Sequence, residues 1–297
     1  MSIITDLKNN YERGNISLRF IYINVGIFIL TSVVNIGFTL FNRPFSLWLL
    51  QWFECPASLR RLLIQPWSLF TYMFMHADVF HILFNMLWLY WFGQLFLYLF
   101  SAKHFRGLYF LGGLCGGALY ILAYNIFPFF APYIGHSYML GASASVLAIA
   151  VATAVREPDY RVNLLLFGAV RLKYLTLILI VTDLLFITSS NAGGHIAHLG
   201  GAIAGFWFAR SFQHGSDPTW WINKTIDTIE GWFSRSKRPQ KPKMKVHYGG
   251  RAADYDYNAC KRDREAEIDR ILEKLKKSGY ESLTSEEKKS LFDASKK

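Results

Sequence analysis

Charged side chains are missing from four long stretches of this 297-residue chain, at residues 20–42, 79–102, 107–155 and 184–209. One helix crosses the ~30 Å hydrocarbon core of a bilayer with about 20 apolar residues. The third stretch, of 49 residues, therefore has room for two crossings and each of the others for one. Only 18% of all residues are charged, against about 25% in soluble domains. These features predict a multi-span membrane protein and exclude a disordered or nucleic-acid-binding tail protein.

A sixth crossing is found when the charge criterion is relaxed to admit Asp183. Residues 174–187 are apolar apart from this aspartate, and we expect residues 164–170 to complete the helix. The 49-residue stretch must turn within 127–132, where Pro128 and Pro132 disfavour a helix. The predicted fold is an all-α bundle of six transmembrane helices, at about 20–42, 80–100, 105–128, 141–155, 172–188 and 196–212.

Basic residues in the short loops predict the orientation, since cytoplasmic loops are enriched in Lys and Arg. The loops at 129–140 and 189–195 carry no charge, whereas the first loop, 43–79, is long, apolar and expected to be outside. Both termini are therefore predicted to be cytoplasmic. The basic residues that carry this prediction precede the first span or follow the second and fourth: Lys8, Arg13, Arg19, Lys103, Arg106, Arg156, Arg161, Arg171 and Lys173.

The chain divides into four predicted parts: a cytoplasmic segment at 1–19, the six-span core at 20–212, a membrane-surface linker at 213–251 and a small helical cytoplasmic tail at 252–297. The linker opens with apolar residues at helical spacing, from Ile222 to Phe233. Seven basic residues without an acid follow between Arg235 and Arg251, which predicts binding to anionic lipids and no nucleic acid. A capping-box pattern, Thr284 to Glu287, predicts the start of the last helix.

Polar side chains within spans are costly and indicate function. The second span opens with His81 and Asn85, the fourth with Ser143 and the sixth with His198. Because these three spans run in the same direction, the four side chains are predicted to lie at one depth, around one cavity. Gly201 and the glycine four residues later would let helices approach closely.

A serine beside a histidine is the minimal set for nucleophilic acyl transfer. Imidazole removes the hydroxyl proton and later protonates the leaving amine. The developing oxyanion needs hydrogen-bond donors, which Asn85, a second imidazole and the backbone N–H of Ser143 can supply.

With these residues in their order, the sequence resembles the rhomboid family of intramembrane serine proteases, and its tail resembles that of a bacterial subgroup. The resemblance covers about residues 15–212. The motifs that carry it are His81-Ile82-Leu83-Phe84-Asn85, Tyr109-Phe110-Leu111-Gly112-Gly113, Gly141-Ala142-Ser143 and Ala197-His198-Leu199-Gly200-Gly201.

The resemblance implies a serine-type endopeptidase that cleaves single-span membrane proteins near the outer face of a bacterial cytoplasmic (inner) membrane. It implies no cofactor and no metal. It implies roles for eight residues: Ser143 as nucleophile, His198 as general base and acid, His81 and Asn85 in the oxyanion hole, and His76, Gly141, Gly201 and Gly205 as supporting residues.

The chain departs from the family pattern at three places. Ala144 follows the nucleophile where glycine is common, Leu147 stands where an aromatic residue stacks on the catalytic histidine, and Trp67 is followed by Ser68 instead of Arg. These departures bear on rate and substrate preference. The alternative is a catalytically inactive rhomboid-like protein that binds membrane clients, and Leu147 is its best support.

Several residues compete for these roles. Ser145 is the rival nucleophile and His195 the rival base, with a loop-end histidine bonded to water as its simpler interpretation. His81 and Asn85 are alternatively an interhelical hydrogen-bond pair. Asp183 could orient the histidine, although an aspartate at the outer end of a span is also able to reach water. A metal enzyme or transporter built on the histidines is the last alternative.

Overall fold

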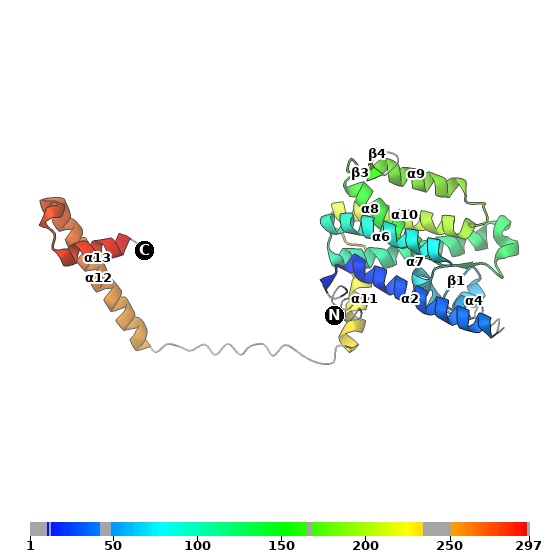
Figure 1. Cartoon of the computed structure of the whole chain (residues 1–297), viewed down its shortest axis with the longest axis horizontal. Helices are drawn as coiled ribbons and strands as arrows, with labels where there is room; N and C mark the ends of the chain where they lie inside the picture. The colour runs from blue at the N-terminus through cyan, green and yellow to red at the C-terminus, as the bar shows by residue number, and fades with distance from the viewer. Residues whose placement is uncertain (1–10, 12, 42–48, 165–167, 234–250, 296–297) are drawn as a thin grey trace. The chain divides into compact units, whose positions relative to one another are not determined.

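The computed structural model describes residues 11, 13–41, 49–164, 168–233 and 251–295 (Figure 1). These residues form two compact units, Met1–Ser234 and Arg235–Lys297. The first unit holds the predicted spans and the second holds the charged tail.

Each predicted span contains a helix in the first unit. The three helices long and apolar enough to cross a membrane, among the described residues, are α2, α6 and α7, and α8 is a shorter apolar helix. The protein is thus a mostly helical membrane protein, and the count of six crossings stays a prediction. The helix bounds are α2 Ile16–Leu40, α6 Val79–Leu99, α7 Ala102–Ile126, α8 Ser143–Arg156, α9 Leu172–Leu185 and α10 Ala192–Gln213.

Helix α10 packs against α7, α8 and α9. Figure 1 shows α9 along one edge of this bundle and α2 along the opposite edge. Glycines bring α10 onto its neighbours, as the sequence predicted: a Cβ on Gly201 would overlap the carbonyl of Ala144, and one on Gly205 would overlap the carbonyl of Ala148. The backbones of α8 and α10 are therefore in direct contact.

Helix starts follow local capping. The side chains of Asn15, Asp78 and Ser101 accept backbone N–H groups at the first turns of α2, α6 and α7. The predicted turn after α7 is confirmed, because α7 ends at Ile126 and a 3-10 helix, η2 Pro128–Tyr133, follows.

Two short sheets were not predicted. Strands β1 Cys55–Pro56 and β2 Tyr138–Met139 pair antiparallel, so the first loop contacts the segment just before α8. Strands β3 Arg161–Leu164 and β4 Gly168–Arg171 form a second antiparallel pair. The prediction that residues 164–170 extend the fifth helix is therefore wrong where the chain is described. Gly168 has φ of +66°, a left-handed backbone that a helix does not accommodate.

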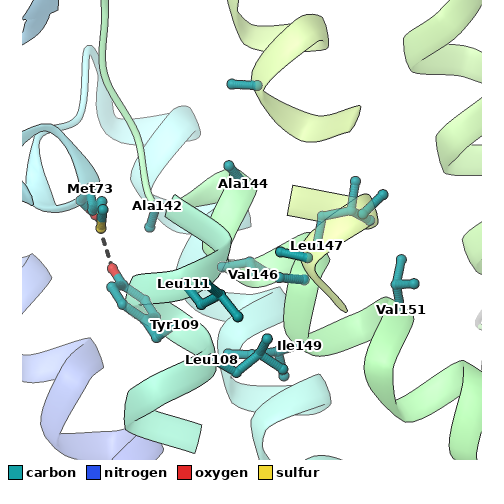
Figure 2. Close-up of a cluster of buried hydrophobic side chains, with 14 of the residues drawn as sticks. Met73, Leu108, Tyr109, Leu111, Ala142, Ala144, Val146, Leu147, Ile149 and Val151 are labelled. Atoms are coloured by element: carbon teal, nitrogen blue, oxygen red, sulfur yellow. Dashed lines mark hydrogen bonds between the residues drawn. The ribbon is translucent and has the colours of Figure 1, made fainter. Parts of the chain in front are cut away.

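The first loop contains three short helical segments, of which α4 and α5 contact β1: α4 Leu59–Ile64, α5 Ser68–Thr71 and η1 Tyr72–Phe74. Tyr109 on α7 donates its hydroxyl to the carbonyl of Met73 at 2.9 Å, as Figure 2 shows within a cluster of buried apolar side chains. The carbonyl of Tyr72 accepts the N–H of Gly141 at 2.9 Å. These bonds connect the loop to the helix core.

Helix α11 Trp220–Phe233 covers the region of the predicted surface linker. Its first turns are buried at Ile222, and Arg106 of α7 pairs with Asp227 and with Glu230, the latter at 3.4 Å. The amphipathic helix is thus attached to the core by burial near its start and by ion pairs in its second half. The polybasic residues 235–250 lie outside the described residues.

The second unit consists of α12 Arg251–Ser278, η3 Tyr280–Ser282 and α13 Ser285–Ser295. The predicted capping box is confirmed, because Glu287 accepts the N–H of Thr284 at 2.8 Å and the Thr284 hydroxyl accepts the N–H of Glu287 at 3.3 Å. Lys274 pairs with Glu287 at 2.9 Å and holds the two helices together.

Candidate active site

Ser143 is the first residue of α8 and is half-buried. Gly141, two residues earlier, has φ of +128°, so the chain turns sharply into the helix there. The rival serine, Ser145, is 1% exposed. Its Cα lies 3.2 Å from a Cβ built on Gly112 of α7, so Ser145 sits at a helix contact.

Two neighbouring cavities share Asn85, Ser143 and His198 in their linings. The sequence predicted that these three residues meet, and the structure brings them together. The first cavity, of about 240 Å³, is lined mainly by apolar side chains of α6, α8 and α9: Phe84, Trp88, Val146, Leu147, Leu179 and Thr182, besides Asp183. The second, of about 560 Å³, is more polar and includes His81, Ser137, Tyr138 and Asn191.

His81 presents one edge of its ring to the start of α8. A Cβ built on Gly141 would lie 3.0 Å from His81 Nε2 and 3.6 Å from Ser143 Oγ, so both atoms flank this glycine. The other ring nitrogen, Nδ1, accepts the N–H of Ala77 at 3.4 Å. A neutral imidazole that accepts at Nδ1 carries its proton on Nε2, so His81 has a donor on the side of Ser143.

Asn85 is buried and lines both cavities. Its amide donates to the carbonyl of His81, one turn earlier, at 2.9 Å. One of the two amide hydrogens is thus committed to the backbone of α6 and the other remains for a ligand. The bond is within one helix, which differs from the interhelical pair considered from the sequence.

His76 lies just before α6 and is 7% exposed. Its ring meets the ring of His81 edge to face, with centroids 5.1 Å apart. Burial, and secondly the neighbouring His81, lower the pKa of His76 to about 4. A neutral His76 at pH 7 therefore packs beside His81 without adding charge to the cavity.

Asp183 is where the structure differs most from expectation. Asp183 is 6% exposed, and its Oδ1 lies 2.8 Å from Nδ1 of His195 and 2.8 Å from Nδ1 of His198. Of the two alternatives considered for Asp183, contact with water is wrong and contact with the histidine is observed, because α9 turns this side chain toward α10. His195 is likewise part of α10 and bonded to a carboxylate, and is no loop-end residue.

These three residues are also a possible metal-binding set. One ligand atom from each lies within 4.8 Å of the others, and two imidazoles with a carboxylate suit zinc. The two hydrogen bonds account for the contacts without an ion. The sequence signal for the cluster was Asp183, the lone charged residue of 174–187.

The two departures at α8 have local explanations. The methyl of Ala144 lies 2.7 Å from a Cβ built on Gly116 of α7, so the glycine there makes room for it. Leu147 is 7% exposed and forms part of the wall of the first cavity. Figure 2 shows both side chains in the buried apolar cluster.

Helices packed through glycine around two adjoining cavities, which share a serine and a histidine, define a helical membrane protein with a polar site inside its bundle. Residues 64–213 match the Rhomboid domain family. The chain belongs to the rhomboid family. Residues 252–297 match a separate family of unknown function, DUF6576.

Two relatives are mitochondrial proteins. RHOMBOID-like protein 12, mitochondrial, of Arabidopsis thaliana is 30% identical over 206 residues, which are 66% of this chain and 58% of that protein. Presenilin-associated rhomboid-like protein A, mitochondrial, of Danio rerio is 27% identical over 191 residues, 63% of this chain and 46% of that protein. The chain thus spans about half the length of these curated relatives, and they lend no support to a bacterial origin.

Proposed function

We propose that this protein is an intramembrane serine endopeptidase that cleaves transmembrane segments near the outer membrane face. The observation that carries the proposal is that Ser143 and His198 line the same two cavities. The Nδ1 of His198 contacts Asp183, which leaves Nε2 as the nitrogen available to the serine. No metal or cofactor takes part in the proposed reaction.

In the proposed reaction, Ser143 Oγ attacks the scissile carbonyl carbon and gives its proton to His198 Nε2. The imidazolium then protonates the leaving amine, and the acyl group remains on Ser143. A water molecule, deprotonated by the same imidazole, attacks the ester and restores the serine. His81 Nε2, the free hydrogen of the Asn85 amide and the N–H of Ser143 are the donors proposed for the oxyanion.

The proposed substrates are single-span membrane proteins. The apolar cavity has walls from α6 and α9, and Phe84 and Thr182 on these helices are exposed at its rim. An apolar substrate helix fits such a wall, and its unwound end would enter the polar cavity beside Ser143. Gly141, Gly201 and Gly205 support the site because any side chain there would displace His81 or separate α8 from α10.

The proposed membrane arrangement has six crossings with both termini on the cytoplasmic side, and the basic residues after α11 facing anionic lipids. Three helices have the length and apolarity of spans, and α8, α9 and α10 would complete the six. A bacterial inner membrane is the location expected from the tail, but the mitochondrial relatives do not support that choice.

The test is labelling of the purified protein by a fluorophosphonate, together with cleavage of a reconstituted transmembrane substrate. Ser143→Ala and His198→Ala should each lose both activities while keeping the thermal unfolding temperature of the wild type. Ser145→Ala is the matched control and should keep both. Full cleavage by Ser143→Ala would contradict the proposal.

A second candidate function is a catalytically inactive rhomboid-like protein that binds membrane clients. The observation that favours it is Leu147 at the position where the family carries an aromatic residue. The same experiment decides between them, because an inactive protein would leave the wild type unlabelled and its substrate intact.

A further inference from the structure

One carboxylate oxygen holds both histidines of α10. Oδ1 of Asp183 lies 2.8 Å from Nδ1 of His195 and 2.8 Å from Nδ1 of His198. A carboxylate accepts hydrogen bonds and does not donate them, so both imidazoles must carry a proton on Nδ1. Both Nε2 atoms are then left as acceptors in the neutral rings.

We infer that Asp183 is a positioning residue of the proposed active site, holding His198 in the Nδ1–H tautomer with Nε2 free for Ser143, and that His195 anchors this carboxylate. The inference rests on the proposed function. It adds a third and a fourth residue to the Ser143 and His198 pair expected from the family resemblance.

The surroundings support a specific role for this carboxylate. Besides Asp183, the titratable side chains that share the cavities with His198 are His81 of α6, Asp78 at the start of α6, and Tyr120, Tyr124 and Tyr138. Asp78 accepts the N–H of His81 at 2.9 Å and so caps its own helix. Asp183 is the acid that contacts His198 directly, and its burial shields the contact from water, which strengthens it.

The role in the reaction is electrostatic and geometric. When His198 Nε2 takes the proton of Ser143 Oγ, the ring becomes positively charged, and the Asp183 carboxylate stabilises that charge through Nδ1–H. No proton moves to Asp183, and the same proton leaves from Nε2 to the departing amine. The second bond, from His195, keeps the carboxylate turned toward α10.

The first measurement compares Asp183→Asn with the wild type in proteoliposomes. The amide can donate where the carboxylate only accepts, so it favours the wrong tautomer of His198. An Asp-to-Asn change in a Ser-His-Asp triad lowers kcat about 10⁴-fold, and we expect a fall of about 10² to 10⁴-fold here. KM and the unfolding temperature should be nearly unchanged, as a residue that acts on the base alone predicts.

His195→Asn is the matched variant, because its amide nitrogen can replace Nδ1 as donor to Asp183. Its kcat should fall about tenfold or less, the factor that one ordinary hydrogen bond contributes. A larger loss than in Asp183→Asn would overturn the assignment of His195 as an anchor.

A second measurement needs no variant and so is independent of folding. The ¹⁵N shifts of labelled histidine in the wild type should report His198 protonated at Nδ1. Protonation of His198 at Nε2 instead, or a wild-type cleavage rate in Asp183→Asn, would overturn the inference. Ser143→Ala tests the proposed function separately. Loss of wild-type labelling on treatment with a chelator, restored by zinc, would also overturn it in favour of a metal site.

Discussion

The two sides of α10 are held in different ways. Toward α7 and α8, Gly200, Gly201 and Gly205 lie so close to neighbouring backbone atoms that no side chain fits. Toward α9, the contact depends on a 14-residue helix whose buried residues are Leu172, Thr176 and Asp183. The serine and histidine helices are therefore fixed to each other by backbone contact, whereas α9 contributes a carboxylate from a lightly attached position.

The largest effect should come from breaking the glycine side. Gly201→Ala places a methyl on the carbonyl of Ala144, and forcing extra volume into a packed contact costs about 1–3 kcal/mol. We expect a lower unfolding temperature in detergent and loss of substrate cleavage.

The control for this change is Gly26→Ala on α2, where nothing lies within 4 Å of an added Cβ. It should leave stability and cleavage unaltered. Equal effects of the two changes would mean that the glycine contact does not hold α10 to α8.

The α9 side is tested by filling the apolar cavity. Leu179→Trp adds volume on the cavity wall and should lower kcat/KM for a transmembrane substrate about tenfold or more, the scale on which hydrophobic pockets discriminate size. Labelling of Ser143 by a small fluorophosphonate should stay close to wild type. A parallel fall in both rates would indicate that α9 supports the site and does not merely line the substrate path.

The first loop is joined to the side of the bundle held by glycine contacts, because its strand β1 pairs with β2 just before Ser143. The pH dependence of protein stability should reveal this connection. Burial raises the pKa of the Glu54 carboxyl, next to β1, to about 7 from its ordinary 4.5. Between these values the folded chain keeps a proton that the unfolded chain releases, so stability should fall as pH rises through this window. Unfolding temperatures from pH 5 to 8 measure it.

Glu54→Gln removes the titrating group and should flatten that pH dependence. Glu157→Gln, at the end of α8, is the control and should leave it intact. A wild-type slope that survives in Glu54→Gln would assign it to another group.

The smallest effect is expected at the attachment of α11. Arg106→Gln removes the pairs with Asp227 and Glu230. The Arg106 side chain is 15% exposed, but its partners are 45% and 66% exposed, and ion pairs open to solvent contribute little. The unfolding temperature should stay near wild type, while limited proteolysis before α11 becomes faster. Lys103→Gln, whose Nζ lies 3.5 Å from Asp227, should alter proteolysis less, and the reverse order would contradict the assignment of Arg106 as the main attachment.

The sequence predicted the structure around the candidate site correctly where residue spacing within one helix determines it, or where a glycine lets two helices approach closely. Ser143 is the first residue of α8, and Asn85 and His198 lie within the first two turns of α6 and α10. Gly201 and Gly205 contact α8 as expected. The rotation of α9 about its axis leaves no such pattern, so the contact of Asp183 with His198 was only one of two alternatives and its contact with His195 was missed. The apolar residues around Gly168 predict a helix, but pairing with the preceding strand, β3, determines the backbone conformation there.

The arrangement of α10 has a consequence for the growing chain. The nucleophile candidate, its oxyanion donors and the carboxylate all precede residue 192, but both histidines that contact Asp183 lie on α10, after every other helix of the bundle. Under the proposed function, the partly synthesised protein has its nucleophile but lacks its general base until α10 has been made. The proposed protease would therefore gain activity only when α10 joins the other helices.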